Sequence, residues 1–175
     1  MTIREVESSD REALRAFFHA VPAQDAAFLK EDLTDDAVID AWLTAGRVTR
    51  LIYVDEDDTI TGVASLTPGL GRSDHVVELR VVVDSRRRRG GVGRKLAQQA
   101  ILTAVRSGCR KLTVEVGATQ DGTINLFREL GFTPEALHLN QVRADDGEFL
   151  DIVVLAHSID DNLSSFSTLG QAAAQ

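Results

Sequence analysis

Hydrophobic and polar positions change their spacing along the chain, and this spacing predicts the order of elements. Residues 2–7 (TIREVE) alternate apolar and polar side chains, which predicts a short strand. Two helices follow, each opened by a capping residue. Ser9, three residues before Glu12, begins the first, and Thr34 begins the second. Gly46 ends the second helix, so the N-terminal part of the chain is mainly helical.

The next part of the chain is rich in β-branched residues and predicts strands. Residues 48–54 and 59–66 flank the polar turn DEDD and predict a β-hairpin. Residues 75–83 end in three valines, as expected of a strand that is buried on both faces. Helical spacing then returns over residues 92–105, where apolar side chains recur on one face.

The remaining segments alternate between strand and helix. We expect a strand at 110–116, a helix at 121–130 closed by Gly131, and a hairpin of 137–142 with 148–157. The order β-α-α-β-β-β-α-β-α-β-β predicts a mixed α/β (α+β) fold. The chain length suits a single domain, which we place at residues 1–160, followed by a C-terminal tail at 161–175 without a clear pattern.

Composition and charge narrow the function classes. The net charge is −8 and the isoelectric point is near 4.9, so the long-range field repels nucleic acids and anionic membranes. An acidic balance also serves solubility. Cys109 is the only cysteine, which excludes an intrachain disulfide and a thiol metal cluster, and we expect no metal. The N-terminus lacks the apolar core of a signal peptide, and we expect a cytoplasmic protein.

One stretch, Arg86 to Leu96 (RRRRGGVGRKL), concentrates positive charge and bare backbone in this acidic chain. A buried strand, a glycine-rich turn and a helix in succession bind phosphate well, because the first helical amides lack intrahelical acceptors. A P-loop does not fit, since no glycine stands in its register before Lys95. A dinucleotide fingerprint fails because Leu96 occupies its third glycine position.

Arg88, Gly91 and Gly93 satisfy the pattern [RQ]-x-x-G-x-[GA], and ELRVVVDSRRRRGGVGRKL with the later INLFRELGF extends the likeness. The chain thereby resembles the GNAT (Gcn5-related) N-acetyltransferases, with matching element order over residues 2–157. The resemblance implies a mostly antiparallel sheet of six to seven strands, helices on both faces, and a splay between the fourth and fifth strands. It also implies acetyl-CoA as the co-substrate.

The resemblance assigns coenzyme contacts residue by residue. The pyrophosphate would lie on amides around Arg88, Arg89, Gly90, Gly91, Val92, Gly93 and Arg94. The pantetheine arm would bind the backbone at Val81 and Val83, and Gln120 replaces the asparagine that relatives often place near this arm. The arginines would steer and clamp the polyanionic coenzyme, although Arg86 and Arg87 are equally compatible with ordinary solvated side chains.

The resemblance implies direct attack of a substrate amine on the thioester in a ternary complex. Many relatives use a tyrosine to protonate the leaving thiolate, but Phe127 stands at that position, and Tyr53 is expected to pack in an early strand. Solvent protonation is feasible, since a thiol has a pKa of about 8.5. For the base we consider Glu78 and Glu115, each of which is also compatible with a structural ion pair, for example with Arg80 or Arg110.

The acceptor is a primary amine of a small molecule or of a protein, either a lysine or an N-terminus. Acidic residues occur where relatives build the acceptor pocket, which suits a cationic amine or, alternatively, helix caps and turns. They are Glu31, Asp32, Asp35, Asp36, Asp145, Asp146 and Glu148. The second hypothesis is an acyl-CoA-binding sensor without catalysis, favoured by Phe127. Homodimers are common in the family, and we expect one here.

Overall fold

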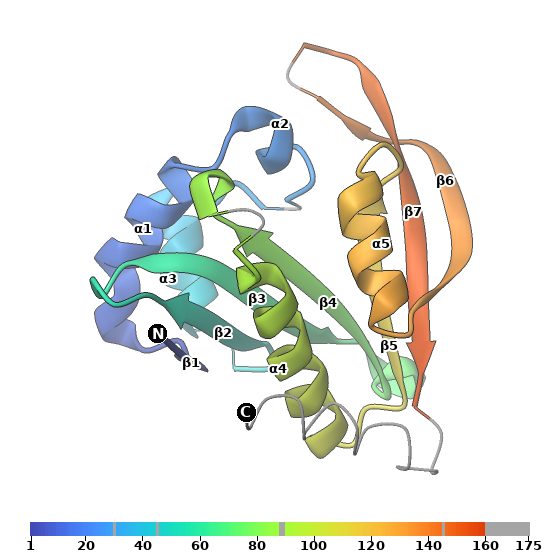
Figure 1. Ribbon diagram of the computed structural model, residues 1–175, viewed down its shortest axis with the longest axis horizontal. Coiled ribbons are helices and arrows are strands. Elements are labelled where there is room, and N and C mark those ends of the chain that lie inside the picture. The colour runs from blue at the N-terminus through green and yellow to red at the C-terminus, as the bar shows by residue number, and fades with distance from the viewer. Residues whose placement is uncertain (30, 45, 88–89, 145, 160–175) are drawn as a thin grey trace.

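A seven-stranded sheet forms the centre of the part of the chain that the computed structural model describes, which is residues 1–29, 31–44, 46–87, 90–144 and 146–159. The strands are β1 (Thr2–Glu5), β2 (Thr49–Val54), β3 (Ile60–Pro68), β4 (Val76–Val83), β5 (Lys111–Gly117), β6 (Thr133–Arg143) and β7 (Phe149–Ser158). They lie in the order β1-β2-β3-β4-β5-β7-β6, and every pair is antiparallel except β4 with β5 (Figure 1). The mixed, mostly antiparallel sheet is confirmed.

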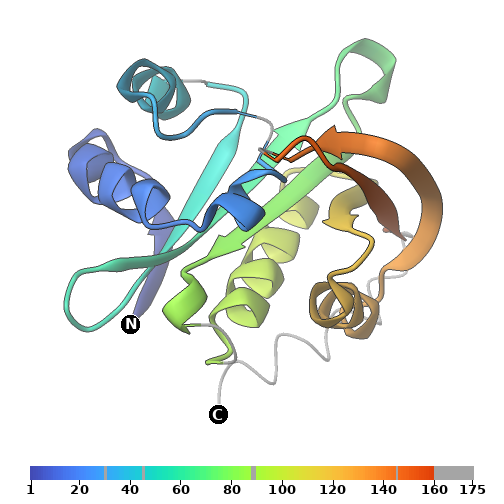
Figure 2. The ribbon, with the colours of Figure 1, turned by 90° about the horizontal axis from the view of Figure 1, so that it is seen from above.

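Helices cover both faces of the sheet (Figure 2). They are α1 (Arg11–His19), α2 (Ala23–Ala26), α3 (Asp36–Thr44), α4 (Val92–Arg106) and α5 (Asp121–Glu129). Short 3-10 turns precede α1 and α4, namely η1 (Ser8–Asp10) and η3 (Ser85–Arg87), and η2 (Gly71–Ser73) precedes β4. Within these residues, each helix is too short or too polar to cross a bilayer.

Two core clusters hold the helices against the sheet. Phe18 of α1 and Trp42 of α3 meet edge to face, with ring centroids 5.5 Å apart, and pack with Ile52 of β2 on one face. Leu96 of α4 is fully buried on the other face, together with Phe127 of α5. The alternation of apolar side chains along each central strand supplies both clusters, because neighbouring residues point to opposite faces.

The sheet opens at its centre. Among the described residues, β4 and β5 pair at three positions, from Val76 with Lys111 to Glu78 with Thr113. Beyond Glu78, β4 continues along β3 while β5 continues along β7, so the two strands diverge. This divergence confirms the expected splay between the fourth and fifth strands, and it produces the opening in which the candidate site lies.

The start of α1 differs from the predicted one. Ser9 and Glu12 do not form the capping box; instead Glu7 donates its backbone N–H to Asp10 Oδ2 at 2.8 Å, so the box lies two residues earlier in the chain. Arg4 holds the Asp10 carboxylate at 2.7 Å and lowers its pKa. The observed cap differs from the predicted one because the charged Asp10 carboxylate, which Arg4 holds in place, is a stronger acceptor than a serine hydroxyl.

Two further boundaries differ from prediction. Asp35, not Thr34, caps α3 by accepting the Ala37 N–H at 2.8 Å. Strand β6 begins at Thr133, earlier than expected, and Pro134 is tolerated there because β6 is an edge strand. The helix α2 was not predicted, since a single turn shows no periodicity. The tail at 161–175 lies outside the described residues.

Candidate functional site

A cleft with a volume of about 780 Å³ runs through the opening between β4 and β5. It extends from the start of α4 and the α5 segment to Asp25 of α2 and to Phe28 and Leu29, which follow α2. A cleft of this size accommodates an extended organic molecule. Its two ends differ in chemistry. We call the end at the start of α4 the phosphate end and the end lined by Arg80, Glu115 and Asp25 the acceptor end, after the ligands that the sequence leads us to expect there.

The phosphate end is made of backbone at the start of α4. Gly91 is the N-cap residue with φ +78°, a left-handed conformation that favours glycine. A Cβ on Gly93 would lie 3.3 Å from Val83 Cγ2, so glycine permits close packing of the loop on β4. The first bond of the helix joins Lys95 N–H to Gly91 O at 3.0 Å, and the preceding amides point out of the helix end. This end is suited to an anion.

Most of the expected coenzyme contacts lie at this cleft. It is lined by Val81, Val83, Gly91, Gly93, Arg94 and Gln120. Val92 instead packs beneath the loop, with its Cγ1 3.1 Å from where a Gly62 Cβ would stand. Gly90 donates its N–H to Arg87 O at 3.3 Å within the loop. Arg88 and Arg89 lie outside the described residues.

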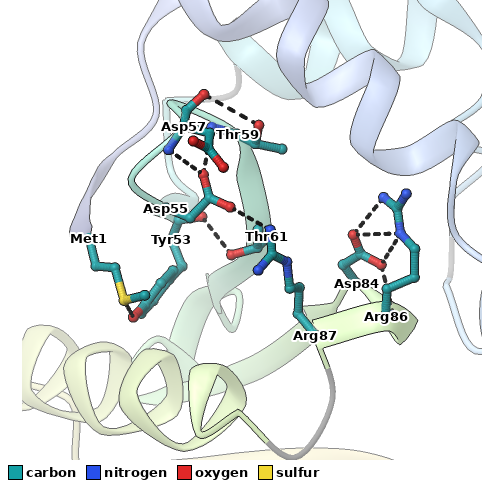
Figure 3. Close-up of polar contacts among 9 residues, drawn as sticks. All are labelled: Met1, Tyr53, Asp55, Asp57, Thr59, Thr61, Asp84, Arg86 and Arg87. Atoms are coloured by element: carbon teal, nitrogen blue, oxygen red, sulfur yellow. Dashed lines mark hydrogen bonds and ion pairs between the residues drawn. The ribbon is translucent and has the colours of Figure 1, made fainter.

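The arginines around this end are paired with carboxylates. Arg86 donates to Asp84 at 2.7 Å, and this bond lowers the pKa of Asp84 against the opposing effect of burial. Arg87 donates to Asp55 of the β2–β3 turn at 3.0 Å (Figure 3). Arg94 pairs with Glu129 at the end of α5. Arg86 and Arg87 are therefore not simply solvated, because each has an anionic partner.

The acceptor end is made of side chains on the two diverging strands. Glu78 and Thr113 form the last pair between β4 and β5. Arg80 lies two residues beyond Glu78, and Glu115 lies two residues beyond Thr113. Both line the cleft, from opposite rims of the opening. Asp25 of α2 also lines it. A guanidinium and carboxylates thus lie at the same end of one cleft.

Glu78 occupies a different position from Glu115. Its Oε1 accepts a bond from Arg80 Nη2 at 2.9 Å, so the ion pair considered from the sequence is present. Both side chains are about three-quarters buried, at 23% exposed for Arg80 and 26% for Glu78. Of the two carboxylates proposed as bases, Glu115 is the one on the cleft wall. Glu78 does not line the cleft but contacts Arg80, which does.

The aromatic residues offer no proton donor at the described cleft wall. Phe127 lines the cleft, is 3% exposed and packs edge to face on Phe132. Tyr53, the only tyrosine, is buried in the sheet, where its hydroxyl donates to Met1 Sδ at 3.2 Å (Figure 3). The packing role expected of Tyr53 is confirmed.

Burial raises the pKa of the Cys109 thiol, which donates to Lys111 O at 3.1 Å.

Several of the acidic residues expected at the acceptor pocket make local hydrogen bonds instead. Asp32 accepts the Thr34 N–H and hydroxyl, and Asp146 accepts the Glu148 N–H. Asp145 lies outside the described residues. The cleft carboxylates that sequence reasoning missed are Asp25 and Asp121. Asp25 follows Pro22 in a single helical turn, where no periodic signal exists to mark it.

Comparisons with known proteins identify one family. The model of the "Acetyltransferase (GNAT) family" matches residues 11–132. A curated relative, the L-methionine sulfoximine/L-methionine sulfone acetyltransferase of Salmonella typhimurium, is 27% identical over 93% of this chain and 96% of its own length.

Solved structures share the fold over nearly the whole chain. The ribosomal-protein-alanine N-acetyltransferase of Brucella melitensis is 26% identical with a TM-score of 0.82, covering 91% of this chain and 100% of its own. A protein from Salmonella typhimurium, solved with its cofactor acetyl-CoA, is 24% identical with a TM-score of 0.79, over 92% of this chain and 95% of its own.

Proposed function

Because the chain belongs to the acetyltransferase (GNAT) family, we propose that it transfers an acetyl group from acetyl-CoA to a primary amine by direct attack in a ternary complex. The observation that carries the proposal is the cleft through the opened sheet, with helix-end amides at one end and charged side chains at the other. Binding both substrates in one cleft makes the reaction effectively intramolecular, which supplies much of the acceleration.

The described residues fit the coenzyme. The amides that precede the first bond of α4 would hold its diphosphate, and Gly93 leaves room for the loop to approach. Backbone groups of Val81 and Val83, on the wall of the opening, would bind the pantetheine arm. Gln120, at the start of α5, would add an amide contact. Arg88 and Arg89 keep their place in the motif as proposed contacts.

We assign the acceptor end to a molecule that carries an anionic group beside its amine. Arg80 supplies a cation for the anionic group, and Glu115 on the opposite rim supplies a carboxylate for the ammonium. The curated relative is named for two amino-acid derivatives, which have both groups. A polyamine or an aminoglycoside would bring only positive charge to Arg80 and is disfavoured.

The reaction needs the ammonium to lose its proton before the nitrogen attacks the thioester carbon. Glu115 takes this proton in our proposal, directly or through water, with Glu78 as the alternative. As the C–N bond forms, the nitrogen gives its second proton to water; the C–S bond then breaks and the electron pair leaves on sulfur. Phe127 cannot protonate the thiolate, so water does so; an anion whose conjugate acid has a pKa of about 8.5 leaves without strong assistance.

The test is thiol release from acetyl-CoA with a panel of amines. The panel contains L-methionine sulfone, its amide without the free carboxylate, spermidine, an aminoglycoside and a lysine peptide. We expect turnover with the amino acid, and we expect Arg80→Met to abolish its advantage over the amide. Faster turnover of spermidine would contradict the acceptor assignment. Tight coenzyme binding without turnover of any amine would favour the alternative function, an acyl-CoA sensor.

A further inference from the structure

The turn that carries Arg87 is fixed at its base by the end of β4. The backbone N–H of Asp84 donates to Thr61 O of β3 at 3.0 Å. The Asp84 carboxylate accepts the Arg86 N–H at 2.9 Å, and the Asp84 carbonyl accepts the Arg87 N–H at 2.9 Å. Asp84 is thus attached to the sheet and in turn holds the backbone of Arg86 and Arg87, so the backbone position of Arg87 is set before any ligand binds.

The side chain of Arg87 is fixed from a second, distant element. Asp55 lies in the β2–β3 turn, and its Oδ1 accepts the N–H groups of Asp57 and Thr59, both at 3.0 Å (Figure 3). Its Oδ2 accepts Arg87 Nη2 at 3.0 Å. The Asp55 side chain is 8% exposed. Because the turn holds this carboxylate in place, the guanidinium is the mobile partner and Asp55 determines where it lies.

The pair between Arg94 and Glu129 is a useful contrast. It lies at the same end of the cleft, but its side chains are 43% and 61% exposed. Arg87 is also partly exposed, at 53%, while its partner is buried. Pairs between exposed side chains fix geometry weakly, since solvent screens them and both chains keep their freedom. Of these two pairs, the one with Asp55 is the one built to position its arginine.

We propose that Asp55 is a positioning residue for the coenzyme: it holds the Arg87 guanidinium at the rim of the cleft, where the guanidinium binds a phosphate group. Arg87 lines the cleft, and its bond to Asp55 uses one terminal nitrogen. A guanidinium has further N–H donors on its other nitrogens, so it serves a carboxylate and a phosphate at once. This inference rests on the proposed function, because it requires a phosphate-bearing ligand.

The sign of the effect separates positioning from simple electrostatics. Removing a negative charge near a polyanion strengthens binding if the charge only repels the ligand. Removing a carboxylate that orients an arginine weakens binding instead, because the side chain must then be ordered when the ligand arrives. Asp55→Asn retains an oxygen for the N–H groups of the turn and loses the charge. Asp57→Asn removes the same charge from the same turn at an exposed side chain.

The experiment is isothermal titration of the full chain with acetyl-CoA, alongside steady-state kinetics. We expect Asp55→Asn to raise Kd and the acetyl-CoA KM about five- to tenfold, with kcat within about twofold. Asp57→Asn should bind as tightly as the wild type or slightly more tightly. Arg87→Gln should weaken binding by a similar factor, and Asp55→Asn should add little in that background.

Three results would overturn the inference. The first is Asp55→Asn binding acetyl-CoA as tightly as Asp57→Asn. The second is an undiminished effect of Asp55→Asn in the Arg87→Gln background, which would show a role independent of the arginine. The third applies if Asp55→Asn does not fold: it is an Arg87→Gln variant that binds acetyl-CoA as tightly as the wild type. A wild-type protein that binds no acetyl-CoA would overturn the proposed function as well, which distinguishes the two failures.

Discussion

The two ends of the cleft are built from different parts of the polypeptide. The phosphate end consists of main-chain amides at the start of α4, reached because Gly91 and Gly93 lack side chains. The acceptor end consists of side chains from separate elements, among them Arg80, Glu115 and Asp25. Main-chain groups recognise what all reactions of a family share, while side chains can change without altering the fold. The difference indicates where specificity is set in this molecule.

The largest effect is expected at the phosphate end. Gly93→Leu places a side chain where a Cβ would already lie 3.3 Å from Val83, beside the amides that we propose hold the coenzyme. Acetyl-CoA binding should weaken at least about 100-fold, because the helix-end amides can no longer be approached. The measurement is titration calorimetry, with circular dichroism to establish folding.

The matched control for this variant is Gly46→Ala. A Cβ on Gly46 would meet no atom within 4 Å, and the residue lies after α3, away from the cleft. Coenzyme affinity should remain that of the wild type. Normal binding by a folded Gly93→Leu protein would show that the phosphate end has been misplaced.

A smaller effect is expected at the acceptor end. Glu115→Gln should lower kcat by about 10² to 10³, the usual contribution of a general base, while the Kd of acetyl-CoA stays within about twofold of the wild type. Glu78→Gln removes the partner of Arg80 and should mainly raise the KM of the acceptor. The two variants are compared by steady-state kinetics against pH. A larger loss of kcat in Glu78→Gln than in Glu115→Gln would reverse the assignment of the base.

The smallest effect concerns stability and pH. Asp84 has a lowered pKa because Arg86 binds its carboxylate, so this carboxylate stabilises the fold above the ordinary aspartate pKa of about 3.9. The stabilisation is lost as the pH falls through the lower folded-state pKa. Asp84→Asn should therefore lower the midpoint of thermal unfolding by about 2–4 °C at pH 7. A difference between the two proteins that persists undiminished at pH 2–3 would contradict this account.

The phosphate end could be predicted from sequence because its determinants are contiguous. A strand ending in valines, two correctly spaced glycines and a helix define the geometry locally, and Gly91 is the left-handed cap in the structure. The element order followed from the spacing of hydrophobic residues along the whole chain, and the divergence of two central strands followed from the likeness of this stretch and of INLFRELGF to a family. The error at α1 arose because a distant side chain, Arg4, selected Asp10 as the capping residue.

The acceptor end could be predicted only in part because its determinants are far apart in sequence. Arg80 and Glu115 both line the cleft because β4 and β5 diverge just before them, and no local pattern encodes this. Asp25 is brought to the cleft by a single helical turn. The acidic residues that stood out in the sequence, such as Asp32 and Asp146, instead make turn hydrogen bonds. The carboxylates on the cleft wall are therefore at other positions than these acidic residues.

The short pairing of β4 with β5 has a mechanical consequence. Strands β1–β4 and strands β5–β7 form two parts of the sheet that share few backbone hydrogen bonds. We expect the sheet to open locally most easily along this boundary, which we call the seam. A molecule that binds in this seam contacts both parts of the sheet and stabilises the native state by mass action. The contacts that bind the ligand therefore also stabilise the fold, because the ligand connects β4 and β5 where backbone hydrogen bonds between them are absent from the described pairing.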